Sequence, residues 1–138
     1  MQELSIKEVE AVAFHLARKH LKFDEPIPDF STRFPNVLES CLAVPFQRFY
    51  GHSPYPTLVA KASILFYLLI KDHPFQNGNK RIALTTVLVF LLKNGKWLEI
   101  DSDALYRLTV WVAQSKAQDK DFVLAAVREL LESHLQNA

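Results

Sequence analysis

The amino-acid sequence predicts an all-α protein. Apolar residues recur at helical spacing through most of the chain, and residues that start or end helices bracket these runs. No run shows the alternation of polar and apolar residues that a half-buried strand requires. The chain has 138 residues, of which 49% are hydrophobic and 22% are charged, so we expect one compact domain over residues 1–138.

The composition also narrows the function. Lys and Arg total 16 against 15 Asp and Glu, which gives no global electrostatic argument for binding nucleic acid or a membrane surface. The longest apolar stretch, Leu58 to Ile70, is interrupted by Lys61 and is too short to span a bilayer, and the N-terminus does not resemble a signal peptide. The single cysteine, Cys41, excludes an intramolecular disulfide and is interpreted as a small core residue. We therefore expect a cytoplasmic protein.

The first helix is predicted at about residues 6 to 20. Ser5 and Glu8 have the spacing of a capping box, in which each side chain accepts a bond from a free backbone N–H group. The apolar residues that follow at helical spacing are Val9, Val12, Ala13, Leu16 and Ala17.

Prolines shape the next part of the chain. They predict a structured loop between Lys22 and Asn36, and Pro35 predicts the start of a short helix. That helix would carry inward Val37, Leu38, Cys41 and Leu42. From Pro45 to Pro56, aromatic residues mix with proline and glycine, which favours an exposed and partly extended excursion.

Four further helices complete the prediction. The nearly all-round apolar run from Thr57 to about Asp72 marks the central helix, and a second apolar helix runs from about Asn79 to Lys93, before the cap at Asn94-Gly95. Acidic residues at Asp101–Asp103 and Asp119–Asp121 predict the starts of the last two. Their apolar residues are Leu105, Leu108, Trp111 and Val112, then Phe122, Leu124, Val127, Leu130 and Leu131.

The loop between the two apolar helices, His73 to Arg81, combines residues suited to phosphate chemistry. Gly78 lets backbone N–H groups approach an anion at a helix start, where the helix dipole is positive. Arg81 can donate two parallel bonds to phosphate oxygens, and Lys80 adds a compact charge. His73 is placed to accept a proton from a hydroxyl that attacks the phosphate. Singly, a helix-end histidine and a Lys-Arg pair are usually a polar cap and a solvated face, but their joint spacing favours a site.

The string His73-Pro74-Phe75-x-x-Gly78-Asn79-Lys80-Arg81 resembles the signature loop of the Fic/Doc superfamily. The continuation Ile82-Ala83-Leu84, with Leu91-Leu92-Lys93-Asn94-Gly95, resembles the Doc (death-on-curing) toxin branch. The segments 36–42 and 55–62 also resemble those that precede the motif in Doc-like toxins, so the likeness covers most of the chain. It implies a six-helix fold with a flap before the central helix, and transfer of part of ATP to a protein hydroxyl.

The resemblance also implies roles for individual residues. His73 would be the base, Lys80 and Arg81 would bind phosphate, and Gly78 with Asn79 would form an anion nest. Fic adenylyltransferases have glycine where this chain has Lys80, and a second arginine where it has Leu84. Both departures indicate a Doc-like kinase that transfers the γ-phosphate, with AMP transfer as the alternative.

Asn77 departs from the family pattern, which has Asp or Glu at this position to help hold Mg²⁺. Because Mg²⁺ prefers anionic oxygen ligands, the neutral amide should weaken metal binding. Three outcomes stay open: the nucleotide phosphates hold the ion almost alone, Asp72 helps, or the protein is a nucleotide-binding or interaction module with weak or no transfer.

The resemblance gives meaning to the predicted excursion before the central helix. In this superfamily such a flap docks an extended segment of the target by main-chain pairing, here through Gln47, Arg48, Phe49 and Tyr50. Arg48 and His52 are also candidate contacts for nucleotide or target. The alternative is a surface loop whose aromatic residues fold back onto the core.

The resemblance implies partners as well. No Ser or Thr has Glu four residues later, so the self-inhibitory helix of some Fic proteins is not supported. A Doc-like toxin of bacteria would instead be restrained by a Phd-like antitoxin protein, whose disordered tail folds as a helix in a groove. Its implied target is elongation factor Tu.

Overall fold

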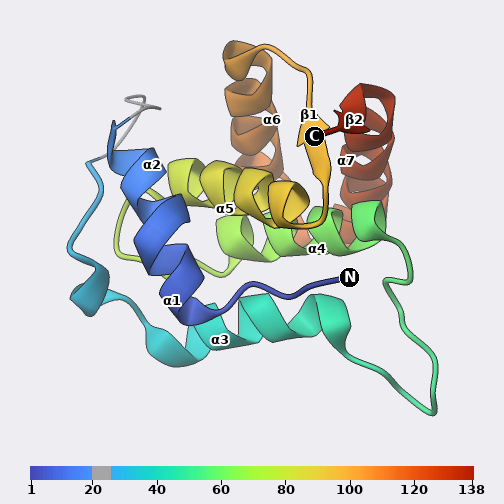
Figure 1. Cartoon of the computed structure of the whole chain (residues 1–138), viewed down its shortest axis with the longest axis horizontal. Helices are drawn as coiled ribbons and strands as arrows, with labels where there is room; N and C mark the ends of the chain where they lie inside the picture. The colour runs from blue at the N-terminus through green and yellow to red at the C-terminus, as the bar shows by residue number, and fades with distance from the viewer. Residues whose placement is uncertain (20–25) are drawn as a thin grey trace.

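The computed structural model describes residues 1–19 and 26–138 of the chain. In this part the protein is a mostly helical single domain around two central helices, α4 (Leu58–Lys71) and α5 (Asn79–Lys93). The loop of residues 72–78 reverses the chain, so that α5 packs along α4 in the opposite direction (Figure 1). This loop contains most of the predicted phosphate motif.

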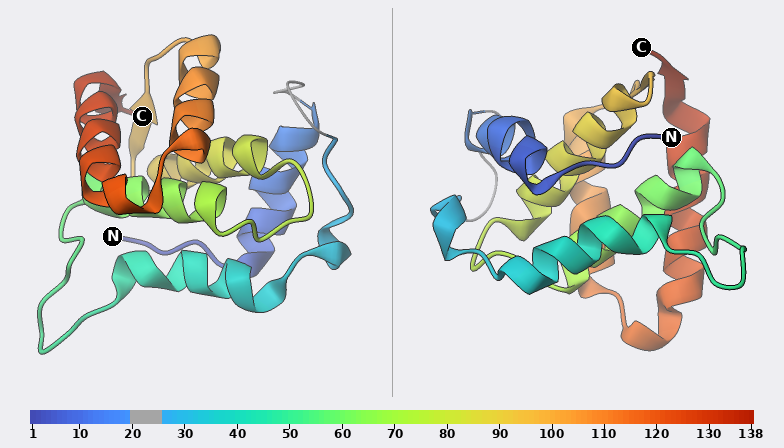
Figure 2. Two further views of the ribbon diagram at one scale, coloured as in Figure 1. Left: turned by 180° about the vertical axis from the view of Figure 1, so that it is seen from behind. Right: turned by 60° about the horizontal axis from the view of Figure 1, so that its bottom comes forward.

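The remaining helices cover this central pair on several sides (Figure 2). The N-terminal helix packs on α5, α3 packs on α4, and the last two helices pack on the pair from the other side. Their bounds are α1 (Ile6–Glu8), the π-helical η1 (Val9–Phe14), α2 (His15–Lys19), the 3-10 turn η2 (Phe30–Thr32), α3 (Pro35–Ala43), the 3-10 turn η3 (Val44–Phe46), α6 (Ser102–Gln114), the 3-10 turn η4 (Ala117–Asp119) and α7 (Lys120–His134).

Helix α4 shows why its sequence is apolar almost all round. It begins after Thr57, whose hydroxyl accepts a bond from the Ala60 N–H at 3.0 Å, and ends at the cap residue Asp72. Because α3, α5 and α7 all pack against it, most of its residues are buried. No helix in the described ranges has both the length and the apolar character needed to cross a bilayer.

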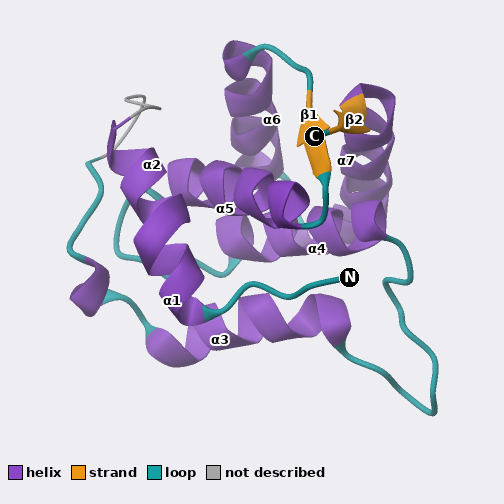
Figure 3. Ribbon diagram, viewed as in Figure 1, coloured by secondary structure: helices purple, strands orange, loops and turns teal. Residues whose placement is uncertain are grey.

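A small two-stranded sheet joins the C-terminus to the segment after α5 (Figure 3). Strands β1 (Lys96–Leu98) and β2 (Leu135–Asn137) pair antiparallel, with Trp97 opposite Gln136. The sequence did not predict this sheet, because strands of three residues are too short to show an alternating pattern.

The structure confirms the predicted all-α class and the six helices, with this small sheet as the addition. The Ser5–Glu8 capping box is present in both directions, and the predicted helices from Pro35, Thr57 and Asn79 are α3, α4 and α5. The part of the predicted proline-rich loop that falls on residues 22–25 lies outside the described residues.

The last two helices begin where the acidic residues predicted, although neither Asp101 nor Asp119 makes a side-chain cap bond. Two of their aromatic residues lie on the surface instead of in the core. Trp111 and the largely exposed Phe122 pack edge to face, with ring centroids 6.4 Å apart.

Candidate active site

His73 lies just beyond the end of α4 in a left-handed backbone conformation. Its φ is +50°, and among the described residues only Tyr50 is another non-glycine with positive φ. This conformation costs a non-glycine residue about 1–2 kcal/mol and is common where function requires the side chain in a fixed place. The turn directs the chain from the cap residue Asp72 toward the start of α5 and leaves His73 exposed.

Asn79, the first residue of α5, closes the loop. Its side-chain oxygen accepts a bond from the Phe75 N–H at 3.0 Å, and its side-chain nitrogen donates to the Phe75 carbonyl at 2.9 Å. These two bonds fix which way the amide points, because only the oxygen can accept from an N–H group. The amide nitrogen therefore also faces His73 Nδ1, at 3.4 Å.

This contact joins the histidine ring to the first turn of α5. A neutral imidazole has one nitrogen that donates and one that accepts, so the partner of Nδ1 influences both ring orientation and tautomer. Asn79 is buried while His73 is exposed, so the anchored amide positions the exposed ring. The sequence assigned Asn79 only to an anion nest, and the structure adds this positioning role.

Phe75 anchors the loop in the core. It is buried, and its ring packs against Phe14 and Phe30 at centroid distances of 5.5 and 5.9 Å. Next to it, the Pro74 carbonyl accepts a bond from the Phe34 N–H at 2.8 Å. The loop is therefore held on one side by the N-terminal helix and on another by the start of α3.

Gly78 precedes α5 with a φ of +73°, a conformation that favours glycine. A Cβ atom at this position would lie 2.6 Å from Ile27 Cδ1, so the 26–28 segment also covers this point closely. Helix α5 has 15 residues, and its first N–H groups and its dipole make its start suitable for an anion. Lys80 lies half-buried in this first turn.

Arg81 lies inside the protein. It is 5% exposed, and its guanidinium donates a 2.5 Å bond to the Ala17 carbonyl near the end of α2. This bond braces the N-terminal helix against α5. The role of Arg81 as a phosphate ligand stays a prediction.

Leu84, one turn further along α5, faces away from the loop. It is buried and lines an apolar cavity of about 220 Å³ between α5, β1 and α6, together with Leu88, Leu98 and Leu105. A leucine therefore suits this position, where the resemblance implies arginine in Fic adenylyltransferases.

The residues present do not fit a resident Mg²⁺ site. Asn77 offers a half-buried neutral amide, and Asp72 is exposed at the other end of the loop. Within residues 1–19 and 26–138, no three His, Cys, Asp or Glu side chains gather as metal ligands do. Because Mg²⁺ prefers anionic oxygens, the neutral amide of Asn77 is by itself a weak ligand for it.

The predicted flap is a tight hairpin. The N–H groups of Phe49 and His52 donate to each other's carbonyls at 2.8 and 2.9 Å, and Tyr50 and Gly51 form the turn with positive φ. Tyr50 is fully exposed and Phe49 is 56% exposed, so these two do not fold back onto the core. Phe46 does so, because its ring packs edge to face on Phe90.

The structure does not bring this flap next to His73. The flap enters α4 at its first turn and His73 follows its last turn, so the two loops lie at opposite ends of the helix (Figure 2). The 14 residues of α4 span about 21 Å at 1.5 Å per residue. The flap residues Gln47, Arg48, Phe49 and Tyr50 stay a proposed docking element, and Arg48 and His52 lie with them.

Lys61 is a residue whose role the sequence did not predict. Its buried ammonium donates to the Pro45 carbonyl at 3.0 Å, to Ser53 Oγ at 3.3 Å and to the Tyr55 carbonyl, which joins both ends of the flap to α4. Burial, with the nearby charge of Arg48, lowers the pKa of Lys61. The sequence signal that could have indicated this role is the position of Lys61 as a single charge within a long apolar run.

Comparisons with known proteins show the family of this chain. The family model described as Fic/DOC family matches residues 3–91. A relative from Mycolicibacterium smegmatis named Toxin Doc is 35% identical over 75 residues, which cover 54% of this chain and 58% of the relative. No solved structure matches the chain. Since the matched region covers more than half of the chain and holds the whole His73–Arg81 loop, all of α4 and most of α5, the chain belongs to the Fic/DOC family.

Proposed function

We propose that this protein is a Doc-like toxin that transfers the γ-phosphate of ATP to a hydroxyl of a target protein. The observation that carries the proposal is the closed loop in which Asn79 links the His73 ring to the start of α5. One group that can take a proton and one helix start that can hold an anion thus share a single loop.

In the proposed reaction, the N–H groups at the start of α5 and the Lys80 charge hold the triphosphate. His73 accepts the proton of the target hydroxyl as its oxygen forms a bond to the γ-phosphorus. The bond between that phosphorus and the bridging oxygen breaks, and ADP leaves with the bond electrons. Positioning and charge stabilisation provide most of the catalysis in such a transfer.

Two residues favour γ-phosphate transfer over AMP transfer, which is the alternative. Lys80 adds a charge in the first turn of α5. Leu84 stands where Fic adenylyltransferases would have a phosphate-binding arginine, and it lines the apolar interior. A second alternative is a nucleotide-binding module with weakened transfer, which the neutral Asn77 favours.

The name of the relative, Toxin Doc, supports a place in a toxin–antitoxin system. We propose an antitoxin partner that binds as a helix in a groove, and a target in translation such as elongation factor Tu. Both would place the protein in the bacterial cytoplasm.

The test incubates the purified protein with bacterial lysate and ATP labelled on either the γ- or the α-phosphate. We expect label from γ-ATP on a lysate protein, and loss of that label with His73→Ala. The matched control is His15→Ala, because His15 is exposed on α2 and is not part of the loop.

Each other outcome has a defined meaning. Label from the α-phosphate would support AMP transfer. If neither form of ATP gives label that is lost in His73→Ala, both reactions are rejected, and the nucleotide-binding module is the alternative that remains.

A further inference from the structure

Helix α3 connects the two loops that α4 separates. The backbone N–H of Phe34, the residue before α3, donates to the Pro74 carbonyl in the His73 loop. After α3, the chain continues through η3 into the flap. The nine residues of α3, at about 1.5 Å per residue, and the three of η3, at about 2.0 Å per residue, together span about 20 Å. An extended peptide of about five or six residues covers that length.

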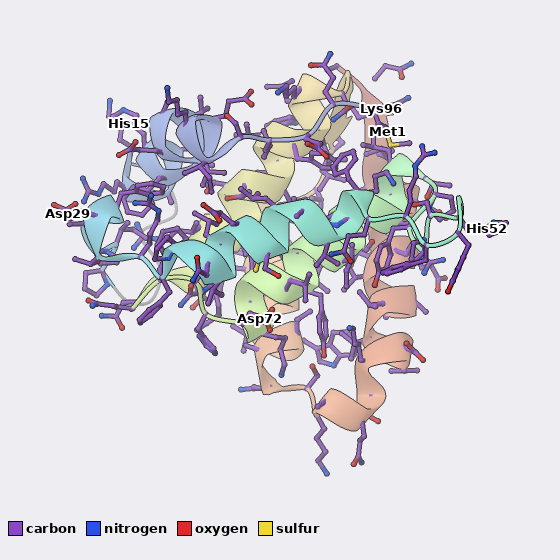
Figure 4. All side chains as sticks on the ribbon, turned by 90° about the horizontal axis from the view of Figure 1, so that it is seen from below. Met1, His15, Asp29, His52, Asp72 and Lys96 are labelled. Atoms are coloured by element: carbon purple, nitrogen blue, oxygen red, sulfur yellow. The ribbon has the colours of Figure 1, made fainter. Side chains whose placement is uncertain are left out.

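An open pocket of about 380 Å³ lies along this path, and none of the site residues above except Asp72 lines it. Its walls are Asn36, Val37 and Ser40 of α3 and Asp72 at the end of α4. Asn36 and Ser40 are one helical turn apart, so their polar groups lie on one face of α3. Figure 4 shows Asp72 beside α3, with His52 of the flap beyond the far end of that helix.

The charge of this pocket comes from Asp72. The carboxylate is exposed, and its charge acts on groups of both α3 and α4. After burial, it is the second cause that raises the pKa of the Cys41 thiol in α3 to about 12, and it also raises the pKa of the Tyr67 hydroxyl in α4. Two lysines near this end of α4 contact groups other than Asp72. Lys71 donates to the carbonyls of Ala113 and Ser115, and Lys120 lies over the Tyr67 ring at 5.7 Å.

We infer that this pocket binds the target segment that carries the acceptor hydroxyl, with a Lys or Arg side chain next to that hydroxyl paired to Asp72. This inference rests on the proposed function. The start of α5 holds the nucleotide phosphates on one side of His73, and Asp72 lies at the other. Asn36 and Ser40 bond the backbone of the same segment, which continues along α3 to the flap.

The experiment first maps the modified residue in the labelled lysate protein. We expect a Lys or Arg within about two residues, since an extended chain advances about 3.4 Å per residue and a lysine side chain spans the rest. Peptides of the mapped sequence are then compared with that basic residue kept, replaced by Ala, or replaced by Glu. Wild-type protein should label the basic peptide about five-fold faster than the Ala peptide, as a partly exposed ion pair supports.

Charge reversal at Asp72 supplies the decisive variant. Asp72→Lys should reverse the order, with the Glu peptide labelled faster than the basic one. Asp103→Lys is the matched control, because Asp103 is an exposed carboxylate at the start of α6, and it should keep the wild-type order. Asn36→Arg changes the opposite wall without touching the His73 loop and should raise the KM of the basic peptide with kcat unchanged.

Failures of the two proposals are distinguishable. No transfer to any lysate protein by the wild type would overturn the proposed function. Transfer to a hydroxyl flanked by acidic residues, or a peptide order that Asp72→Lys leaves unchanged, would overturn the docking inference alone. An Asn36→Arg variant with an unchanged KM would do the same, even if Asp72→Lys failed to fold.

Discussion

The loops at the two ends of α4 each contain one non-glycine residue with positive φ, but they are held in different ways. The loop with His73 is fixed at several points, by the Asn79 amide, the buried Phe75 ring and the Phe34–Pro74 bond. Within the described residues, the contacts of the loop with Tyr50 lie at its base, at Lys61, and its tip is fully exposed.

This difference suits two different tasks. A group that transfers a proton must be held within a fraction of an ångström of its productive place, which requires contacts along the whole loop. A surface that meets a partner needs a defined position but also an accessible tip. The comparison therefore assigns chemistry to the His73 loop and recognition to the flap, and the following changes test that assignment.

The largest effect is expected from Asn79→Ala. The Phe75 N–H and carbonyl would lose their partners in a buried place, at about 1–3 kcal/mol, and His73 would lose its contact. We expect transfer to fall about 10- to 100-fold, as an effect of that size on the barrier implies. Single-turnover kinetics with γ-labelled ATP measures it, and Asn137→Ala, at an exposed asparagine of β2, serves as control for a general amide loss. Full activity in Asn79→Ala would contradict a positioning role.

A smaller effect, in the opposite direction, is expected from Asn77→Asp. A carboxylate in place of the amide adds an anionic oxygen for Mg²⁺. Transfer should rise several-fold at limiting Mg²⁺ and converge with wild type at saturating Mg²⁺, as a titration of the rate would show. An unchanged titration would mean that position 77 does not limit the use of Mg·ATP.

Lys61→Met should loosen the flap and leave the His73 loop intact. Loss of three bonds to Pro45, Ser53 and Tyr55 would open its base, so trypsin should cut after Arg48 several-fold faster. Lys61→Arg keeps a cation as the control. Equal cleavage rates in Lys61→Met and wild type would show that the lysine does not hold the flap.

The smallest effect is expected from glycine at the two strained positions. Tyr50→Gly and His73→Gly each relieve a left-handed conformation, and each should raise the free energy of unfolding by up to about 1 kcal/mol. Urea denaturation of the two variants measures this. A lower free energy of unfolding in either variant would show that the native side chain stabilises the fold by more than its backbone strain destabilises it.

The fold was predictable where local signals decide it. Thr57 and the Asn94-Gly95 pair define helix ends through bonds to neighbouring residues, and Pro35 defines a helix start through its fixed φ, so the sequence predicts all three. The β1–β2 pairing joins residues about 40 apart, and nothing in either short strand indicates its partner.

The site was predictable in its chemistry and less so in its contacts. The motif names His73, Gly78 and Lys80 as a group. The burial of Arg81 against Ala17 depends on how the N-terminal helix packs, and the spacing of residues in the motif does not show that packing. In the same way, the bonds from Asn79 to Phe75 depend on the left-handed turns at positions 73 and 78.

The most direct test of this account is the mass of the modified target after reaction with unlabelled ATP. The account predicts the gain of a phosphoryl group, lost in His73→Gly and retained in Tyr50→Gly, although both variants relieve the same backbone strain. An adenylyl group on the target, or a modification that persists in His73→Gly, would contradict it.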